Sequence, residues 1–187
     1  MRISLMMLIV VLLSACASAP PSLVYHQLYT GMPASYPATQ SDEMITLAPL
    51  RVADYLQQAA LVMRKQDGTL HYSSTHFWGG SLATDVELQL FDSLNIAAGE
   101  RRYIRYMSPA KAYNSTQLNI ALEQLLPTED GQLLVQISFW LEQDNKLLKN
   151  GRLAVTFPIE GAGYERAVSA MRNGLMQIAQ QLHSQLN

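Results

Sequence analysis

Cys16 is the residue whose chemistry stands out first, because it is the only cysteine in a chain of 187 residues. A thiolate is a soft nucleophile, and it can take a diacylglyceryl group through a thioether bond. The residues directly before it, Ser14 and Ala15, are small enough to let a peptidase reach the bond that precedes Cys16. Cleavage there would expose a new amino terminus that can be acylated in turn. We therefore expect covalent diacylglyceryl and N-acyl lipid on Cys16 and no other cofactor.

The segment before Cys16 has the layout of an export signal. Arg2 supplies a positive charge, and residues 3–13 form a mostly apolar run that small residues follow. This run is too short to span a bilayer, which needs about 20 apolar residues. The motif Leu13-Ser14-Ala15-Cys16 resembles the bacterial lipobox, so we predict a lipoprotein signal peptide over residues 1–15. The alternative is an ordinary signal peptide with an incidental cysteine, which the position, the flanking residues and the cysteine count disfavour.

The residues after the motif indicate where the lipid would hold the chain. A single acyl chain anchors weakly, at about 0.8 kcal/mol per buried CH₂, so stable anchoring needs two or three chains such as palmitate. Ala17, and not an aspartate, follows Cys16, which by resemblance to lipoprotein sorting in diderm bacteria favours the outer membrane. Residues 16–22 contain two prolines and small residues, and they predict a short, lipidated tether. We expect a domain held close to the membrane and facing the periplasm.

Composition limits what the rest of the chain can be. The 13 basic and 15 acidic residues give a net charge of −2, which leaves no basic footprint for nucleic acid. The length after the tether fits one domain over residues 23–187. The 49% of hydrophobic residues are enough for a proper core. Since the single cysteine would carry lipid, no disulfide can support the fold, even in an oxidising compartment.

No pattern typical of catalysis is present in the sequence. The motifs of nucleophilic hydrolases, phosphate-binding loops and zinc proteases are absent, so we predict that the protein is not an enzyme. The histidines are not at metal-ligand spacing on one element, and the two closest are His71 and His76 across a predicted loop. We expect them to be solvated or structural and expect no metal. The remaining histidines are His26 and His183.

Two tryptophans are candidates for contact with a partner. Trp78 precedes a predicted helix, where such a residue most often packs into the core. The alternative is an exposed aromatic that docks a partner, since tryptophan is enriched at interaction hot spots. Trp140 follows the alternating core position Phe139 and is expected on the opposite, helix-free face of its strand. There it would be available to a lipid or a neighbouring subunit.

A small basic group is the third candidate for a contact surface. We favour a solvated strand face for these side chains. The alternative is a contact with acidic lipid or with a partner protein. The group consists of Arg101, Arg102 and Arg105.

Hydrophobic periodicity predicts an α+β fold. Helical spacing of apolar residues indicates two helices, one capped by Ser81 and ended by Gly99, the other from Tyr164 to Leu182. Asp67-Gly68 is a hairpin signal, residues 31–43 read as a loop and residues 53–58 as a helical turn. Period-two alternation predicts strands over 23–29, 44–52 (with Pro49 interrupting), 60–65, 70–72, 101–106, 117–123, 133–141 and 147–157 (split at Gly151). We expect two layers, a mixed and mostly antiparallel sheet with two main helices packed on one face.

The order of these segments resembles one family. The lipobox is followed by VYHQLY, then ITLAPLRVADYLQQAALVMRK, then LHYSSTHFWGGSLATDVELQLFDSL. This order is similar to that of the ABC-type transport auxiliary lipoproteins, which include PqiC and YmbA, and the similarity covers most of residues 23–187. Where the family commonly has Val-Pro-Asp-Tyr-Leu, this chain has Val52-Ala53-Asp54-Tyr55-Leu56.

The resemblance implies a role in lipid transport. Members of the family are outer-membrane lipoproteins that accompany MCE-domain proteins, which bridge the two membranes and move lipids. They are not enzymes, and they can assemble into homo-oligomeric rings. Only Cys16 carries over as a site residue, as the point of lipid attachment. Two alternatives stay open, a stand-alone envelope lipoprotein that binds lipid and one that assists an outer-membrane barrel.

Overall fold

The computed structural model of the chain describes residues 21–31, 40–109 and 116–187. The predicted signal peptide, Cys16 and most of the predicted tether lie outside the described residues, so their assignment stays a prediction.

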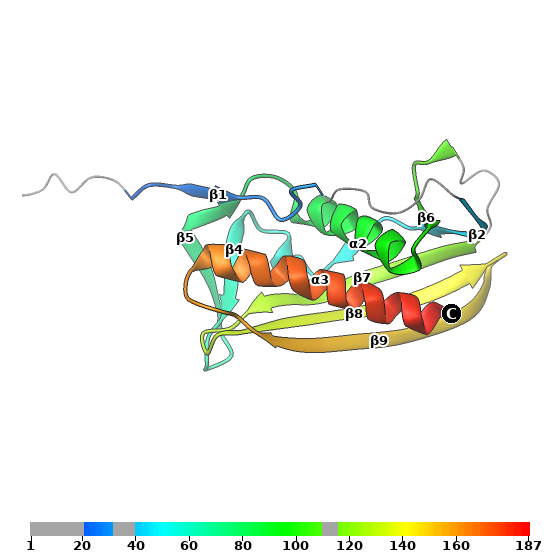
Figure 1. The fold of residues 1–187 in the computed structure, drawn as a ribbon. Coiled ribbons are helices and arrows are strands. Elements are labelled where there is room, and N and C mark those ends of the chain that lie inside the picture. The colour runs from blue at the N-terminus through cyan, green and yellow to red at the C-terminus, as the bar shows by residue number, and fades with distance from the viewer. Residues whose placement is uncertain (1–20, 32–39, 110–115) are drawn as a thin grey trace, which may run out of the picture.

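The strands form two sheets of unequal size (Figure 1). In the small sheet, β1 (Val24–His26) pairs in parallel with β5 (Leu70–Trp78), which pairs antiparallel with β4 (Ala60–Arg64). The large sheet has the order β6-β2-β7-β8-β9, and the short β3 pairs with β7. Its strands are β6 (Arg101–Arg105), β2 (Gln40–Leu47), β3 (Arg51–Val52), β7 (Thr116–Pro127), β8 (Gln132–Gln143) and β9 (Lys146–Pro158).

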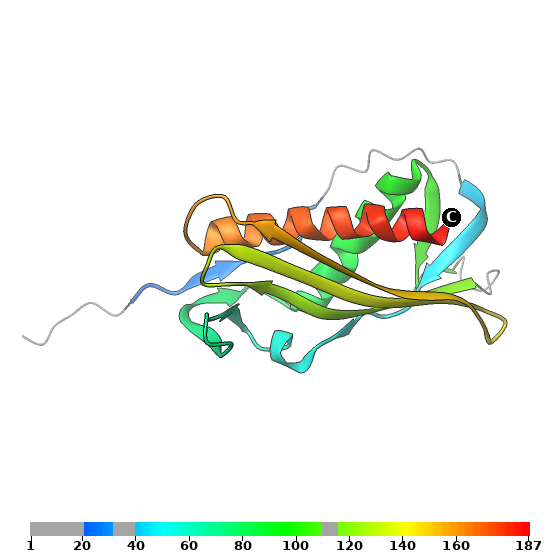
Figure 2. The ribbon, with the colours of Figure 1, turned by 90° about the horizontal axis from the view of Figure 1, so that it is seen from below.

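Two helices lie together on one side of the large sheet (Figure 2). They are α2 (Leu82–Ala98) and α3 (Tyr164–Leu186), and a short 3-10 turn, η2, covers Asp54–Leu56. The strands β7, β8 and β9 are antiparallel neighbours, whereas β2 runs parallel to both β6 and β7. The predicted α+β class is therefore confirmed, with a mixed, mostly antiparallel sheet under two helices.

The register of β8 explains how the core forms. Alternate residues of this strand, among them Leu133, Val135 and Ile137, are buried under the helices. Helix α3 approaches them at Gly174, where an added Cβ would lie 2.9 Å from Cγ2 of Val135 and 3.1 Å from Cδ2 of Leu133. A glycine at this position lets the helix pack directly on the strand.

Local signals at the ends of α2 behave as the sequence predicts. The Ser81 hydroxyl accepts a hydrogen bond from the backbone N–H of Thr84 at 3.3 Å, which satisfies one donor of the first turn. Gly99 ends the helix in the left-handed region, at φ 70°. Gly68 likewise has φ 85° in the turn between β4 and β5, so the predicted hairpin at Asp67-Gly68 is confirmed.

Several strands differ in length from the prediction. Strand β5 continues from Tyr72 to Trp78, past a register shift in its pairing with β4, and there the Ser73 hydroxyl accepts hydrogen bonds from the N–H groups of Thr75 and His76. The register shift disturbs the alternation on which the prediction depended. Strand β7 reaches Pro127 past a register shift after Leu122, which interrupts its period in the same way.

The remaining differences lie in β1, β2 and β9. Strand β1 is shorter than residues 23–29, and β2 begins at Gln40, inside the predicted loop. Strand β9 is continuous through Gly151, where the prediction divided it. The glycine is required there because an added Cβ would lie 2.8 Å from the Phe139 ring. Within the described residues, no helix has both the length and the apolar character needed to cross a bilayer.

Candidate functional site

Three of the four histidines have side-chain hydrogen-bond partners. Nε2 of His26 lies 2.8 Å from Nδ1 of His76, so the structure pairs these two residues and not His71 with His76. Nδ1 of His183 lies 2.8 Å from the hydroxyl of Tyr103. In the part of the chain that the structure describes, no three His, Cys, Asp or Glu side chains could hold a metal ion together.

The His26–His76 pair ties β1 to β5 and to the start of α3. The His76 ring stacks on Tyr164 with centroids 4.0 Å apart, and the two imidazoles stack at 5.1 Å. Burial lowers the pKa of His26, and the neighbouring His76 lowers it further, while Glu165 acts in the opposite direction. The lowered pKa favours a neutral His26 imidazole, and its contact with His76 holds the first strand against the domain.

The residues directly after β1 are clamped between both helices. The Asp85 carboxylate on α2 accepts hydrogen bonds from the backbone N–H groups of Leu28 and Tyr29, at 2.9 and 3.2 Å. Arg172 on α3 donates from Nε to the Leu28 carbonyl and from Nη2 to the Gln27 carbonyl, at 2.7 and 2.8 Å. We call these contacts the N-terminal clasp. Sequence analysis missed them, because no local motif links residues so far apart in the chain.

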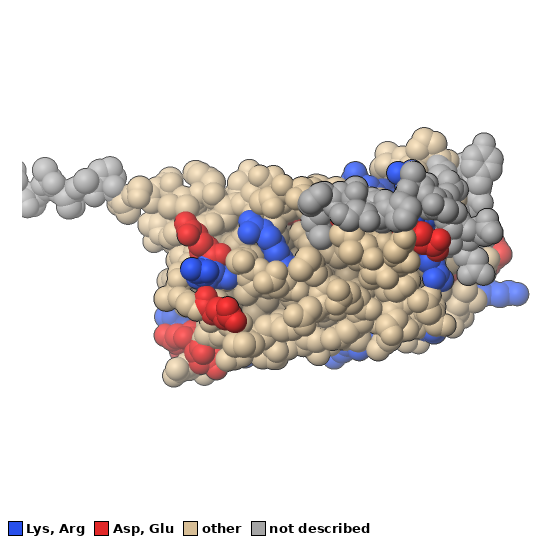
Figure 3. Space-filling model, in the orientation of Figure 1, with Lys and Arg blue, Asp and Glu red and all other residues tan. Residues whose placement is uncertain are grey.

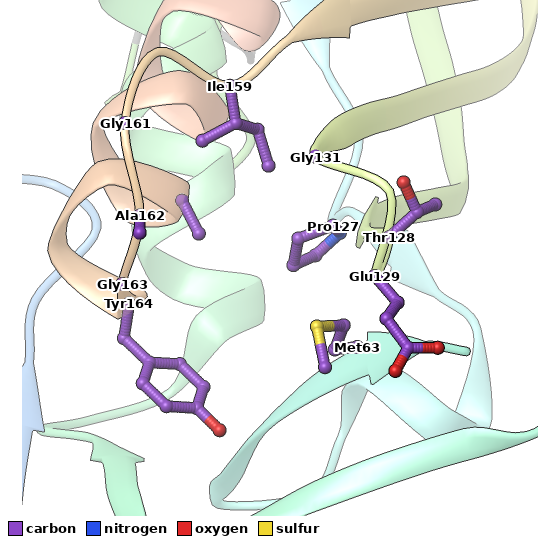
Figure 4. A pocket seen from close by; sticks show the side chains of 11 residues that line it. Met63, Pro127, Thr128, Glu129, Gly131, Ile159, Gly161, Ala162, Gly163 and Tyr164 are labelled. Atoms are coloured by element: carbon purple, nitrogen blue, oxygen red, sulfur yellow. The ribbon is translucent and has the colours of Figure 1, made fainter. Parts of the chain in front are cut away.

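A pocket of about 350 Å³ lies between the end of β4, the β7–β8 turn and the β9–α3 loop (Figure 4). Met63, Pro127 and Ile159 point toward one another across it, and Tyr164 closes one side. Two polar side chains of its lining already have hydrogen-bond partners. The Thr128 hydroxyl donates to the Gln132 carbonyl at 3.0 Å, and the Glu129 carboxylate accepts from the Gln66 N–H at 3.1 Å. The pocket therefore suits an apolar group.

Trp140 lies on the helix-free face of the large sheet, as the alternation of its strand predicts. The buried residues of β8 face the helices, so the half-buried Trp140 lies on the other side. The guanidinium of Arg51, on β3, lies 5.1 Å from the centroid of the Trp140 ring, which is a cation–π distance. We call this face, centred on Arg51 and Trp140, the Trp140 face.

Glu123, a carboxylate on the same face, forms hydrogen bonds with three neighbouring side chains. Glu123 on β7 accepts hydrogen bonds from Ser138, Gln136 and Arg152, the last at 2.6 Å from Nη2. The hydrogen bond from Ser138 is the largest of the effects that lower the pKa of Glu123. The carboxylate is thus engaged within the sheet, and it does not have the raised pKa that a general acid needs.

Trp78 does not offer a contact surface. It ends β5, is 7% exposed and belongs to the core, so the docking alternative for this residue is corrected in favour of core packing. The irregular pairing of β5 carries the strand through to Trp78 and places its ring inside. The indole therefore stabilises the domain and cannot reach a partner.

The structure places the three arginines in different surroundings. Nη1 of Arg102 donates to Oδ1 of Asn187, at the end of α3. Arg105 is exposed and forms a 3.6 Å ion pair with Glu87 on α2. Arg101 is exposed at the start of β6. Two of the three side chains are thus engaged with different helices.

The sequence was compared with known families and proteins. The family model described as ABC-type transport auxiliary lipoprotein component matches residues 26–183, from the end of β1 to within α3. No curated protein matches the chain.

Two solved structures share the fold. A crystal structure of an uncharacterized protein has a TM-score of 0.73 and 16% identity, and the match covers 89% of this chain and 99% of that one. Protein XCC0632 from Xanthomonas campestris has a TM-score of 0.64 and 11% identity, with 88% of this chain and 89% of that one covered. At such identities the likeness shows that the fold is common to all three chains.

Proposed function

The chain belongs to the family of ABC-type transport auxiliary lipoprotein components, and from this membership we propose that it is a non-enzymatic docking subunit of an MCE-type intermembrane lipid transport system. It is anchored by lipid on Cys16 in the outer membrane and faces the periplasm. The observation that carries the proposal is the family match over nearly the whole folded domain, which follows a lipobox cysteine by a few residues. Transport energy and catalysis belong to other subunits.

The anchor is supported by the order of residues at the start of the chain. The lipobox places Cys16 seven residues before Leu23, so the folded domain is held near the leaflet that takes the lipid. Two or more acyl chains give stable anchoring. Ala17 supports the outer membrane over the inner one, by resemblance to lipoprotein sorting.

The Trp140 face is the surface that we assign to the partner. Trp and Arg are enriched among the residues that dominate binding energies. Here an indole and a guanidinium already stack on a sheet face that neither helix covers. A periplasm-spanning MCE-domain protein is the partner, and several copies of the auxiliary subunit arranged in a ring would present this face repeatedly to its end.

A second candidate function follows from the pocket between β4 and α3. Its apolar lining and its volume of about 350 Å³ suit part of an acyl chain, which favours a stand-alone lipid-binding lipoprotein. An assistant of an outer-membrane barrel is the third alternative, and it has no specific site in the described structure.

In-cell crosslinking of the lipidated protein, followed by purification and mass spectrometry, separates these functions. We expect to recover an MCE-domain protein together with self-crosslinked multimers. Trp140→Ala should reduce the crosslinks to the MCE-domain protein, because the variant removes the aromatic contact. Tyr72→Ala is the matched control, since it removes a 39% exposed aromatic from the small sheet.

Two results would contradict the proposal. Recovery of only a barrel protein would favour the assembly role. Recovery of only bound lipid, with no protein partner, would favour the pocket as the functional site.

A further inference from the structure

An apolar patch surrounds the point where the chain enters the domain. Leu23 and Tyr25 are 55% and 65% exposed and lie two residues apart. Tyr25 pairs with Phe77 across the parallel β1–β5 ladder, and their ring centroids are 5.9 Å apart. Leu23 lies directly before β1, two residues from Tyr25. We call Leu23, Tyr25 and Phe77 the entry patch.

The entry patch lies in a part of the chain without formal charges. Residues 17–41 contain no Asp, Glu, Lys or Arg, and neither do residues 70–84, which include all of β5. Figure 3 shows a strip without charged groups at the start of β1, with charged side chains gathered below it at the same end of the molecule. An uncharged surface can enter a less polar environment without the large cost of removing charges from water.

The distance to the lipid is limited by the chain itself. Leu23 lies seven positions after Cys16, and a fully extended chain of that length spans at most about 25 Å. The N-terminal clasp holds the residues after β1 to both helices through Asp85 and Arg172. Because the strand is fixed to the domain, lipid on Cys16 keeps the whole entry patch close to one leaflet.

We propose that Leu23, Tyr25 and Phe77 form a bilayer contact, which inserts into the interfacial region of the leaflet that carries the lipid on Cys16. The proposal rests on the lipid anchor of the proposed function. Tyrosine rings are favourable at this depth, because their apolar body meets acyl chains while the hydroxyl stays near the headgroups. The anchor also keeps the patch at a high effective concentration near the bilayer. A patch that is too weak to bind membranes alone can therefore still contact the leaflet.

The contact would orient the domain with its opposite end away from the membrane. Helix α3 begins at Tyr164, beside His76 of β5, and its 23 residues extend about 34 Å. Its far end meets the β8–β9 hairpin, where Lys149 donates to the Gln185 carbonyl. Figures 1 and 2 show β1 and this hairpin at opposite ends of the molecule. The exposed Leu147 and Leu148 of the hairpin then face the periplasm.

The test uses the full lipidated chain reconstituted into vesicles of phosphatidylethanolamine and phosphatidylglycerol. Intact mass first establishes that Cys16 is acylated, which blocks the only native thiol. A single new cysteine is then labelled with an environment-sensitive fluorophore in Tyr25→Cys or in Leu147→Cys. The second variant is the matched control, because Leu147 is 61% exposed and lies at the opposite end. Both variants are checked for an unchanged circular dichroism spectrum.

We expect the label at position 25 to shift to shorter emission wavelengths and to be quenched by lipids that carry a quencher near the headgroup. The label at position 147 should show neither effect. An unquenched label at position 25 on acylated protein would overturn the bilayer contact and leave the anchor intact. Quenching at position 147 alone would reverse the orientation and overturn the proposal as well.

A second copy of the chain is the competing occupant of the entry patch. In that case the emission shift at position 25 would grow with the protein-to-lipid ratio and would not respond to quencher lipids, which overturns the bilayer contact. The absence of acyl mass on Cys16, or of an MCE-domain protein among the crosslinks, would count separately against the proposed function.

Discussion

At the scale of single residues, the chain uses its unusual side chains for structure. His26 and His76 bond to each other, His183 bonds to Tyr103, and Trp78 fills the core. These contacts need no chemistry beyond hydrogen bonding and burial. Trp140 and Arg51 form a cation–π pair on a face of the large sheet that neither helix covers.

The buried imidazoles should make stability depend on pH. The pKa of His26 is lowered, first by burial, then by His76 and by Arg172, against the opposing effect of Glu165. The unfolded chain therefore binds more protons than the folded chain just below the usual histidine pKa of about 6.5. The free energy of unfolding should be highest above that pH. It should fall as the pH drops toward the pKa of His26 in the folded chain. Urea midpoints at about pH 7.5 and about pH 5 measure the difference.

Two variants assign this pH dependence. His26→Gln should reduce the fall in the urea midpoint but not remove it, because burial also lowers the pKa of His183. His71→Gln, at an exposed position, should leave the fall unchanged. Equal slopes for wild type and His26→Gln would show that the His26–His76 pair does not couple protonation to folding.

Not every residue role could be read from the sequence. Cys16 and its flanks are a contiguous motif, so their chemistry is visible locally, and the exposed side of Trp140 follows from strand alternation. Asp85 and Arg172 give no such signal, because a carboxylate that binds backbone N–H groups 57 residues away looks like any exposed helical residue. Contacts to the backbone depend on the fold and leave no pattern of residue types.

At the scale of elements, the N-terminal clasp joins a short strand to two helices. Strand β1 has only three residues, too few to be held by its ladder alone. The carboxylate of Asp85 and the guanidinium of Arg172 supply four further hydrogen bonds to the backbone that follows it. The first strand is thus part of the domain and not an extension of the tether.

Removal of the Asp85 carboxylate should loosen this segment. Hydrogen bonds to a charged group contribute about 1.5–3 kcal/mol, so Asp85→Ala should lower the free energy of unfolding by about that amount. Hydrogen exchange should show faster exchange of the amides of residues 28 and 29 than in wild type. Glu87→Ala is the control on the same helix, because its 3.6 Å ion pair with Arg105 is partly exposed and contributes less than about 1 kcal/mol. Equal exchange in the two variants would contradict the role of the clasp.

The close contact between α3 and the sheet predicts that a methyl group added at Gly174 lowers the stability of the domain. Alanine favours a helix over glycine by about 1 kcal/mol. In Gly174→Ala, however, the added Cβ would meet the buried Val135 and Leu133 at 2.9 and 3.1 Å, and overpacking costs about 1–3 kcal/mol. The clash outweighs the helical gain, so thermal unfolding should occur at a lower temperature.

The neighbouring position provides the control for this variant. Asn173 is exposed on α3, so Asn173→Ala should keep or slightly raise the melting temperature. A Gly174→Ala protein that melts above wild type would mean that the helix can move away from the sheet at no cost.

At the scale of the whole molecule, the predicted α+β class is right. The sequence does not reveal, however, which strands belong to which of the two sheets. The segments around Ile45 and Val62 are close in sequence, yet they belong to different sheets. Periodicity reports which side of a strand is buried, and it carries no information about which strand lies beside it. In the large sheet β2 and β6 are parallel neighbours, because the chain between them crosses over through the small sheet and α2.

The parallel pairing of β1 and β5 has a mechanical consequence for an anchored protein. A pull from the membrane would reach the domain at Leu23, along the axis of β1, and would slide β1 against β5. In this geometry the ladder bonds and the Arg172 and Asp85 contacts bear the load together, whereas a hairpin pulled open at its end loses its bonds one at a time. The proposed lipid anchor on Cys16 would apply force along this line, and the pairing of β1 with β5 would resist that force in shear.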